Sequence, residues 1–142
     1  MKVQFALATA VGAIGLLAAT PAIAKTVHFT TALNGASEVP PNDSKATGKV
    51  DADFDTATSA FGYTITYSGL TGPAVAAHFH GPAAAGANAP PIIAIDKLPS
   101  PVKGSAKLTA DQAKDLLAGK WYFNVHTAAH PGGEIRGQLT QP

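Results

Sequence analysis

The stretch of sequence that decides the fold starts with Ala-Ala-His-Phe-His-Gly-Pro at residues 76–82. Side chains along a β-strand alternate between two faces, so a strand here would put His78 and His80 on one face and Phe79 on the other. A strand with one apolar and one polar face is typical of antiparallel sheets, which bury one side and leave the other to water. This stretch therefore predicts an antiparallel sheet whose polar face carries histidines.

Residues 122–138, which read Tyr-Phe-Asn-Val-His-Thr-Ala-Ala-His-Pro-Gly-Gly-Glu-Ile-Arg-Gly-Gln, divide in the same way. We expect two strands, over residues 121–128 and 134–140, joined by a type II turn with Pro131 and Gly132 at its centre. The apolar face of these strands holds Trp121, Phe123, Val125, Ile135 and Leu139. The polar face holds Tyr122, Asn124, His126, Glu134, Arg136 and Gln138. A cluster of imidazoles beside a carboxylate and a guanidinium is a candidate site.

The rest of the chain repeats the pattern of short strands separated by turn signals. One helix is expected, with Thr109 as N-cap, Gln112 completing a capping box and Gly119 ending it. Seven or so short strands predict an all-β fold, a single antiparallel, Greek-key-like β-sandwich with one short helix. Beyond the two strands already described, strands are expected over residues 27–33, 49–55, 60–70, 76–80 and 92–98.

The core is expected to combine one face of each strand with the apolar stripe of the helix. The chain contains no cysteine, so packing must hold the domain together without disulfides. The same absence excludes a thiol nucleophile and thiolate metal sites. The expected core residues are Phe29, Val50, Phe54, Phe61, Tyr63, Ile65, Tyr67, Phe79, Ile93, Leu116, Trp121, Phe123, Val125, Ile135 and Leu139.

The first 24 residues have the features of a secretory signal peptide. Lys2 precedes an apolar run over residues 5–19, and Ala22-Ile23-Ala24 is a small-x-small cleavage site. The run is short for a membrane span, although an uncleaved anchor helix is the alternative. We therefore expect a mature protein that starts at Lys25, a single domain over residues 25–142, and a periplasmic or secreted location without a membrane span.

The charges are nearly balanced, with 10 Lys and Arg against 9 Asp and Glu. One of the basic residues, Lys2, leaves with the signal peptide. Without a basic stripe or a polybasic segment, neither nucleic acid nor an anionic lipid surface is an expected partner. We expect a monomer whose partner is a protein or a small-molecule ligand.

Several motifs are similar, in content and in order, to those of the CHRD (chordin) domain family, and they cover nearly everything after residue 27. In animals, such domains are repeated in chordin, an extracellular antagonist that binds growth factors. The resemblance implies a single-domain, exported member of the bacterial type, for which no general activity carries over. The motifs are Glu38-Val39-Pro40-Pro41, Tyr67-Ser68-Gly69-Leu70-Thr71-Gly72, Ala77-His78-Phe79-His80-Gly81-Pro82, Leu108-Thr109 with Gln112 and residues 116–119, and Asn124-Val125-His126-Thr127 continued by residues 131–138.

The histidines support two interpretations. His78 and His80 have a spacing that recurs among metal ligands on strands, and His126 from a neighbouring strand would complete a three-histidine site. Three histidines with an open position describe a zinc site, and imidazole also suits copper. Alternatively, the imidazoles hydrogen-bond to loop backbone and to Glu38 or Glu134, and so hold the loops rich in Gly and Pro in place.

We expect a non-enzymatic, exported binding module. The sequence has no Gly-x-Ser-x-Gly elbow, phosphate loop or dinucleotide fingerprint. Arg136 could hold a ligand carboxylate, or it could pair with Glu38 or Glu134. A copper- or zinc-binding protein and a structural module of the envelope or matrix are the two alternatives. The expected binding residues are His78, His80, His126, Glu134, Arg136, Glu38 and Asn124.

Overall fold

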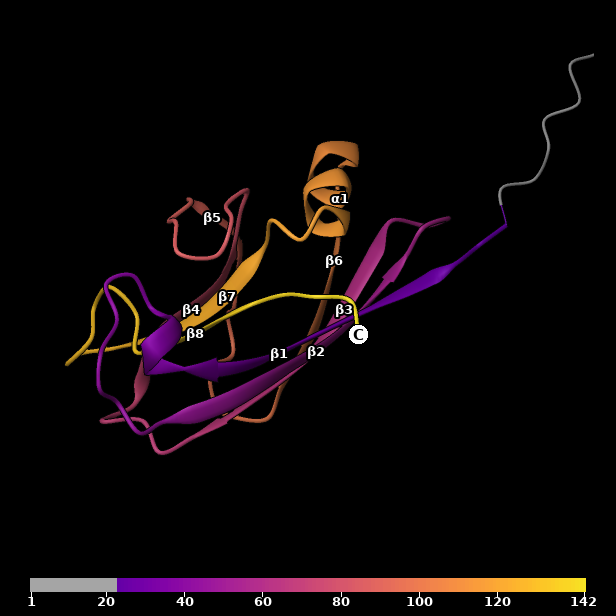
Figure 1. The fold of residues 1–142 in the computed structure, drawn as a ribbon. Helices are drawn as coiled ribbons and strands as arrows, with labels where there is room; N and C mark the ends of the chain where they lie inside the picture. Colours follow the sequence, from indigo (N-terminus) through magenta and orange to yellow (C-terminus); the bar gives the residue numbers. More distant parts are fainter. Residues whose placement is uncertain (1–22) are drawn as a thin grey trace, which may run out of the picture.

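The computed structural model describes residues 23–142, and nearly all of the predicted signal peptide lies outside the described residues. Figure 1 shows this part of the chain as strands with one α-helix at one end of the sheet. No helix in the described part is long and apolar enough to cross a membrane. The elements are β1 (Thr26–Asn34), the 3-10 helix η1 (Gly35–Ser37), β2 (Thr47–Asp55), β3 (Ala60–Ser68), β4 (Ala74–His80), β5 (Pro91–Ala94), β6 (Val102–Lys107), α1 (Ala110–Leu117), β7 (Tyr122–Thr127) and β8 (Ile135–Gln138).

The strands form a sheet in the order β5-β4-β7-β8-β1-β2-β3-β6, and every pair within it is antiparallel. The long strands β1, β2 and β3 lie side by side as one twisted layer (Figure 1). Phe79 of β4 meets Phe61 and Tyr63 of β3, with ring centroids 5.3 and 5.1 Å apart, so the two halves of the sheet pack face to face. The predicted all-β antiparallel sandwich with one short helix is confirmed.

Aromatic side chains fill the centre of the core. The indole ring of Trp121 lies edge-on to Phe61, and Phe123 packs against Phe79 with ring centroids 4.8 Å apart. Such tilted and edge-to-face contacts add to the free energy gained by burying the rings. The expected core residues are buried, except for three that pack on its border in partly buried positions: Tyr63, Tyr67 and Ile93.

Helix α1 begins and ends as expected. The Thr109 hydroxyl accepts a hydrogen bond from the Gln112 backbone N–H, and the Gln112 side chain accepts one from the Thr109 N–H. Gly119 has a φ of 71°, the left-handed conformation that glycine adopts at little cost. Leu116 is buried in the core, whereas the neighbouring Leu117 is exposed.

Two strands differ from the prediction. The strand expected over residues 92–98 is shorter, because β5 spans only Pro91–Ala94. Strand β6 was not predicted from the sequence, since only Val102 among its residues is buried. As an edge strand paired with β3 alone, β6 can form with little apolar alternation. Gly104 of β6 leaves space that the Tyr63 ring occupies, because an added Cβ would collide with that ring.

The turn between β7 and β8 forms at the expected residues, but it is not of type II. The Gly133 N–H donates to the His130 carbonyl at 3.0 Å, which closes a four-residue turn. A type II turn requires a positive φ at Gly132. The positive φ of 129° belongs instead to Gly133, whose Cα packs against Glu38 and Asn124.

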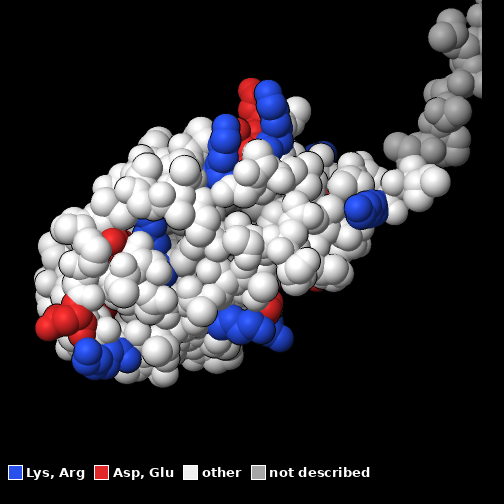
Figure 2. Space-filling view, viewed as in Figure 1, with Lys and Arg blue, Asp and Glu red and all other residues white. Residues whose placement is uncertain are grey.

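The face of β7 that was expected to be exposed to solvent is covered by loops. Tyr122 and Asn124 are almost as well buried as Phe123 between them. The loops before β2 and β5 cover this face, as contacts of Asn88 with Val39 and of Tyr122 with Ala89 show. Figure 2 shows that charged side chains are few and scattered on the side of the molecule in view. Tyr122 and Asn124 therefore lie inside the protein, whereas His126 is only partly buried.

Candidate functional site

The pairing of β4 with β7 brings the three histidines together. His78 lies opposite Asn124 in the register, and Ala76 lies opposite His126. Neighbouring strands thus place His78, His80 and His126 on one face. One ring nitrogen from each histidine lies within 4.8 Å of the corresponding nitrogens of the other two. The face alternation read from the sequence accounts for this convergence.

The closest contact within the cluster joins His78 and His126. The His78 Nδ1 lies 3.3 Å from the His126 Nε2, and the ring centroids are 5.2 Å apart. The His80 ring is 5.4 Å from that of His78 and 6.4 Å from that of His126. Two tetrahedral zinc ligands at ~2.1 Å from the metal are separated by ~3.4 Å, so His78 and His126 already have a suitable spacing.

Two backbone carbonyls fix the orientation of two rings. The His126 Nδ1–H donates to the Pro131 carbonyl, and the His80 Nδ1–H donates to the Ala89 carbonyl, each at 2.9 Å. A neutral imidazole that donates from Nδ1 carries its lone pair on Nε2. Metal-bound histidines are usually held by hydrogen bonds of this kind.

The environment favours the neutral form of His78 and His80. Burial lowers the pKa of His78, and the neighbouring His126 and His80 lower it further. Burial also lowers the pKa of His80, against the opposing effect of its hydrogen bonds to Ala89 and Asn124. The neutral form is the one that binds a metal ion.

Asn124 faces the second ring nitrogen of His80. The His80 Nε2 lies 3.0 Å from the Asn124 Oδ1, an acceptor, so this contact is a hydrogen bond only when Nε2 carries a proton, which a metal ion at Nε2 would displace. The other side of Asn124 faces Glu38. The amide therefore links the histidine cluster to a buried carboxyl group.

Glu38 is only 3% exposed, and its Oε1 has no hydrogen-bond partner among the described residues. Burial raises the pKa of Glu38 to about 7, although the positive charge of Arg136 and the contact with Asn124 lower it in part. The charge of Glu38 therefore changes near neutral pH.

Glu134 has a different role from the histidines. Its carboxylate accepts hydrogen bonds from the Ser44 hydroxyl at 2.7 Å and the Thr127 hydroxyl at 2.6 Å. It also accepts bonds from the N–H and the hydroxyl of Thr71, both at 2.9 Å. Burial alone would raise the pKa of Glu134, but these four hydrogen bonds outweigh it and hold the pKa below its usual value. Glu134 thus ties three segments of the chain together.

Arg136 forms an ion pair with neither Glu38 nor Glu134 within residues 23–142. Its guanidinium donates to the Asn88 Oδ1 at 2.9 Å and to the Ala87 carbonyl, and its central carbon lies 3.4 Å from the centroid of the Tyr122 ring. The sequence pointed to none of the loop residues that Arg136 contacts, because nothing in their composition marks them as partners.

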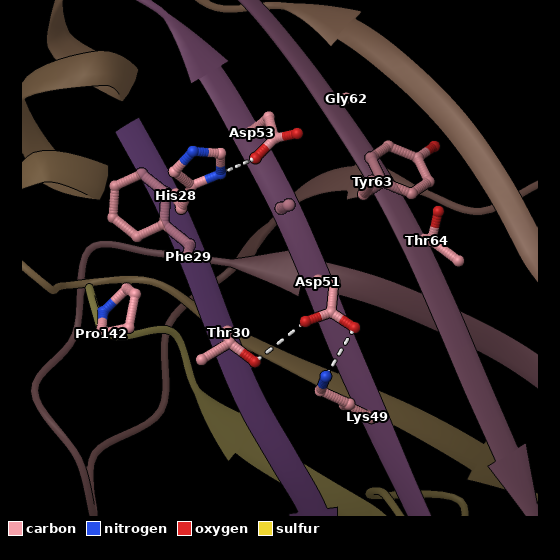
Figure 3. A pocket seen from close by; sticks show the side chains of 11 residues that line it. His28, Phe29, Thr30, Lys49, Asp51, Asp53, Gly62, Tyr63, Thr64 and Pro142 are labelled. Carbon is pink, nitrogen blue, oxygen red and sulfur yellow. Dashed lines mark hydrogen bonds and ion pairs between the residues drawn. The ribbon is translucent and has the colours of Figure 1, made fainter. Parts of the chain in front are cut away.

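The exposed carboxylates of β2 form a separate surface. His28 pairs with Asp53, and Asp51 contacts Lys49 at 2.9 Å and the Thr30 hydroxyl at 3.1 Å (Figure 3). These residues line a shallow hollow on the outer face of β1, β2 and β3. Each of these two carboxylates contacts a side chain on its own strand or on β1, and they do not converge on one point. This arrangement is typical of the solvated face of a sheet.

The family model of the CHRD domain matches residues 29–139. The protein therefore belongs to the CHRD domain family, as the motifs indicated. Comparisons with curated proteins and with solved structures found no match.

Proposed function

We propose that the protein is a non-enzymatic, exported binding protein that holds one transition-metal ion, Cu(II) or Zn(II), between His78, His80 and His126. The observation that carries the proposal is the convergence of three imidazole nitrogens within 4.8 Å. The Nδ1 atoms of His80 and His126 are held by carbonyls, so Nε2 is the nitrogen of each ring that could bind a metal ion, in place of its present contact with Asn124 or His78.

The donor set favours these two metals. Imidazole nitrogen suits copper and zinc, whereas Cu(I) prefers thiolate and thioether sulfur. The chain has no cysteine, and its only methionine is Met1. With three protein ligands, a tetrahedral ion would keep one position for water or a partner's ligand. On the Irving–Williams order, Cu(II) should bind more tightly than Zn(II).

Export and the absence of catalysis are supported by other observations. CHRD domains are typically extracellular, and residues 1–24 have the composition of a signal peptide. The carboxylate of Glu134, beside the polar face of β7 and β8, already accepts hydrogen bonds from Ser44, Thr71 and Thr127. It is therefore a poor general base.

Isothermal titration of the purified protein with Cu(II) and with Zn(II) tests the proposal. The parent should bind a single ion, and metal should raise its melting temperature by mass action. His80→Ala should weaken binding by more than ~100-fold, since even changes behind a metal ligand cost ~10–100-fold. His28→Ala is the matched control, because His28 is exposed and pairs with Asp53 away from the cluster. Equal affinity in the His80→Ala and parent proteins would refute the site.

A structural role is the second candidate, favoured by the hydrogen bonds of His80 and His126 to the Ala89 and Pro131 carbonyls. If the parent binds neither metal, this role accounts for the cluster. His80→Ala should then lower the free energy of unfolding by ~1–3 kcal/mol, because it leaves buried polar partners without hydrogen bonds.

A further inference from the structure

A second pocket lies between η1 with the segment after it and the loop that precedes β5. Its volume is about 410 Å³, within the range of small-molecule sites. Figure 2 shows a hollow on the side in view with basic atoms recessed in it. The residues of the pocket that matter here are the apolar Val39, Pro41 and Ala85 and the polar Glu38, Arg136 and Gln138.

Arg136 provides a buried positive charge in the wall of this pocket. It is only 2% exposed, yet its hydrogen-bond acceptors, the Asn88 amide oxygen and the Ala87 carbonyl, are neutral. A guanidinium has five N–H donors, and these two bonds use only part of them. Buried arginines are usually paired with an anion, because an isolated buried charge is costly.

Glu38 supplies that anion only in part. It lines the same pocket but forms no ion pair with Arg136 within the described residues. Because burial raises the pKa of Glu38 to about 7, much of this carboxyl group is uncharged near neutral pH. At the edge of this open pocket Arg136 therefore has no ion-pair partner among the described residues, and Glu38 offsets its charge only in part.

We propose that this pocket binds a small organic monocarboxylate, whose carboxylate contacts the guanidinium of Arg136 and whose apolar tail packs against Val39, Pro41 and Ala85. Arginine suits a carboxylate, because its planar guanidinium can donate two parallel hydrogen bonds to the two carboxylate oxygens. The contacts of Arg136 with Tyr122 and Asn88 hold the guanidinium in place before a ligand arrives, which lowers the entropy cost of binding.

This site goes beyond the proposed metal function and does not depend on it. Tyr122, on the strand between β4 and β8, separates the histidine cluster from Arg136. A ligand at the guanidinium would therefore reach none of the three histidines directly. Carboxylate binding and metal binding can be tested, and can fail, separately.

The test uses butyrate as the probe and 1-butanol as its neutral counterpart, each titrated into the full chain and followed by amide chemical shifts. Butyrate should shift the amides of residues 36–39 and 85–86, and butanol should bind far more weakly. Arg136→Gln should weaken butyrate binding by about 10- to 100-fold, the loss expected for hydrogen bonds to a charged group. His28→Ala, a change at an exposed residue that pairs with Asp53 away from this pocket, should leave it unchanged.

A second pair of variants keeps the test decisive if Arg136→Gln does not fold. Ala85 is exposed and lines the pocket, so Ala85→Leu should fill the site of the apolar tail and weaken binding. Ala84 is also exposed but does not line it, so Ala84→Leu should bind butyrate like the parent. A parent that binds no butyrate, or an Ala85→Leu variant that binds it like the parent, would overturn the proposal.

Discussion

The guanidinium of Arg136 stacks on the Tyr122 ring, with its central carbon 3.4 Å from the ring centroid. The same ring is parallel to the imidazole of His80, with an interplanar angle of 2° and centroids 4.7 Å apart. Tyr122 therefore sits between a permanent cation and a candidate metal ligand on three neighbouring strands. The charge of Arg136 adds to the effect of burial in lowering the pKa of His80.

The hydroxyl of Tyr122 is expected to anchor the loop before β5. It donates to the Ala89 carbonyl at 3.1 Å and accepts from the Ala89 N–H at 3.2 Å. Tyr122→Phe keeps the ring and removes both bonds, so it should lower the free energy of unfolding by about 1–3 kcal/mol. Urea denaturation measures the change. A variant as stable as the parent would show that water replaces the hydroxyl without loss.

The pKa of Glu38 predicts how stability depends on pH. Its folded-state pKa of about 7 is higher than the usual 4.5, so the folded protein binds the proton more tightly than the unfolded chain does. The contribution of Glu38 to stability is therefore full below pH 4.5 and is lost as pH rises through 7. Glu38→Gln should remove this decline and should be more stable than the parent at pH 8, as measured by urea denaturation across that range.

Face alternation predicted the aromatic core and the histidine cluster because both depend on parity within single strands. Phe79 and Phe123 face inward, and His78 and His126 face the other way, as the period of two requires. The alternation of side chains could not reveal that the polar face is itself covered by loops. Nor could it find β6, whose residues carry almost no apolar alternation.

The role of Glu134 could not be read from the sequence for a related reason. Its partners Ser44 and Thr71 lie 90 and 63 positions away, in loops whose paths no local pattern describes. Composition marked Glu134 as a candidate binding residue because it is a carboxylate near histidines. In the structure this carboxylate instead accepts hydrogen bonds from Ser44, Thr71 and Thr127 and so holds parts of the fold together.

Replacing Glu134 should therefore destabilise the fold. In Glu134→Gln an NH2 group replaces one acceptor oxygen and faces donors, so hydrogen bonds to Thr127 or Thr71 are lost. Each bond to a charged group contributes ~1.5–3 kcal/mol, and we expect a loss of at least ~3 kcal/mol at pH 7 in urea denaturation. Metal binding by the folded fraction should be unchanged.

Glu134 should also make the stability of the protein depend on pH in the acidic range. Because its hydrogen bonds hold the pKa of Glu134 below 4.5, its contribution to stability is present above that pH and lost as pH falls through the lowered value. The difference in stability between Glu134→Gln and the parent should therefore shrink in acid. A difference that stays constant down to acid pH would contradict this account of the carboxylate.

Two adjacent glycines in the turn before β8 should respond in opposite ways to the addition of a methyl group. Gly133 has a φ of 129°, and an added Cβ would collide with the Glu38 Oε1 and meet the Asn124 Nδ2 at 2.7 Å. The φ of Gly132 is not positive, and the space around its Cα is open. Gly133→Ala should therefore cost about 1–3 kcal/mol of unfolding free energy from backbone strain alone.

Gly132→Ala is the matched control and should be neutral or stabilising by about 0.4–1 kcal/mol, because alanine restricts the unfolded chain. Thermal and urea denaturation of the two variants measure the contrast. Gly133→Ala should also change the apparent pKa of Glu38, since the methyl group would push on its carboxyl group, and Gly132→Ala should not. Equal stability of the two variants would mean that the turn relaxes freely and that Glu38 is not held against Gly133.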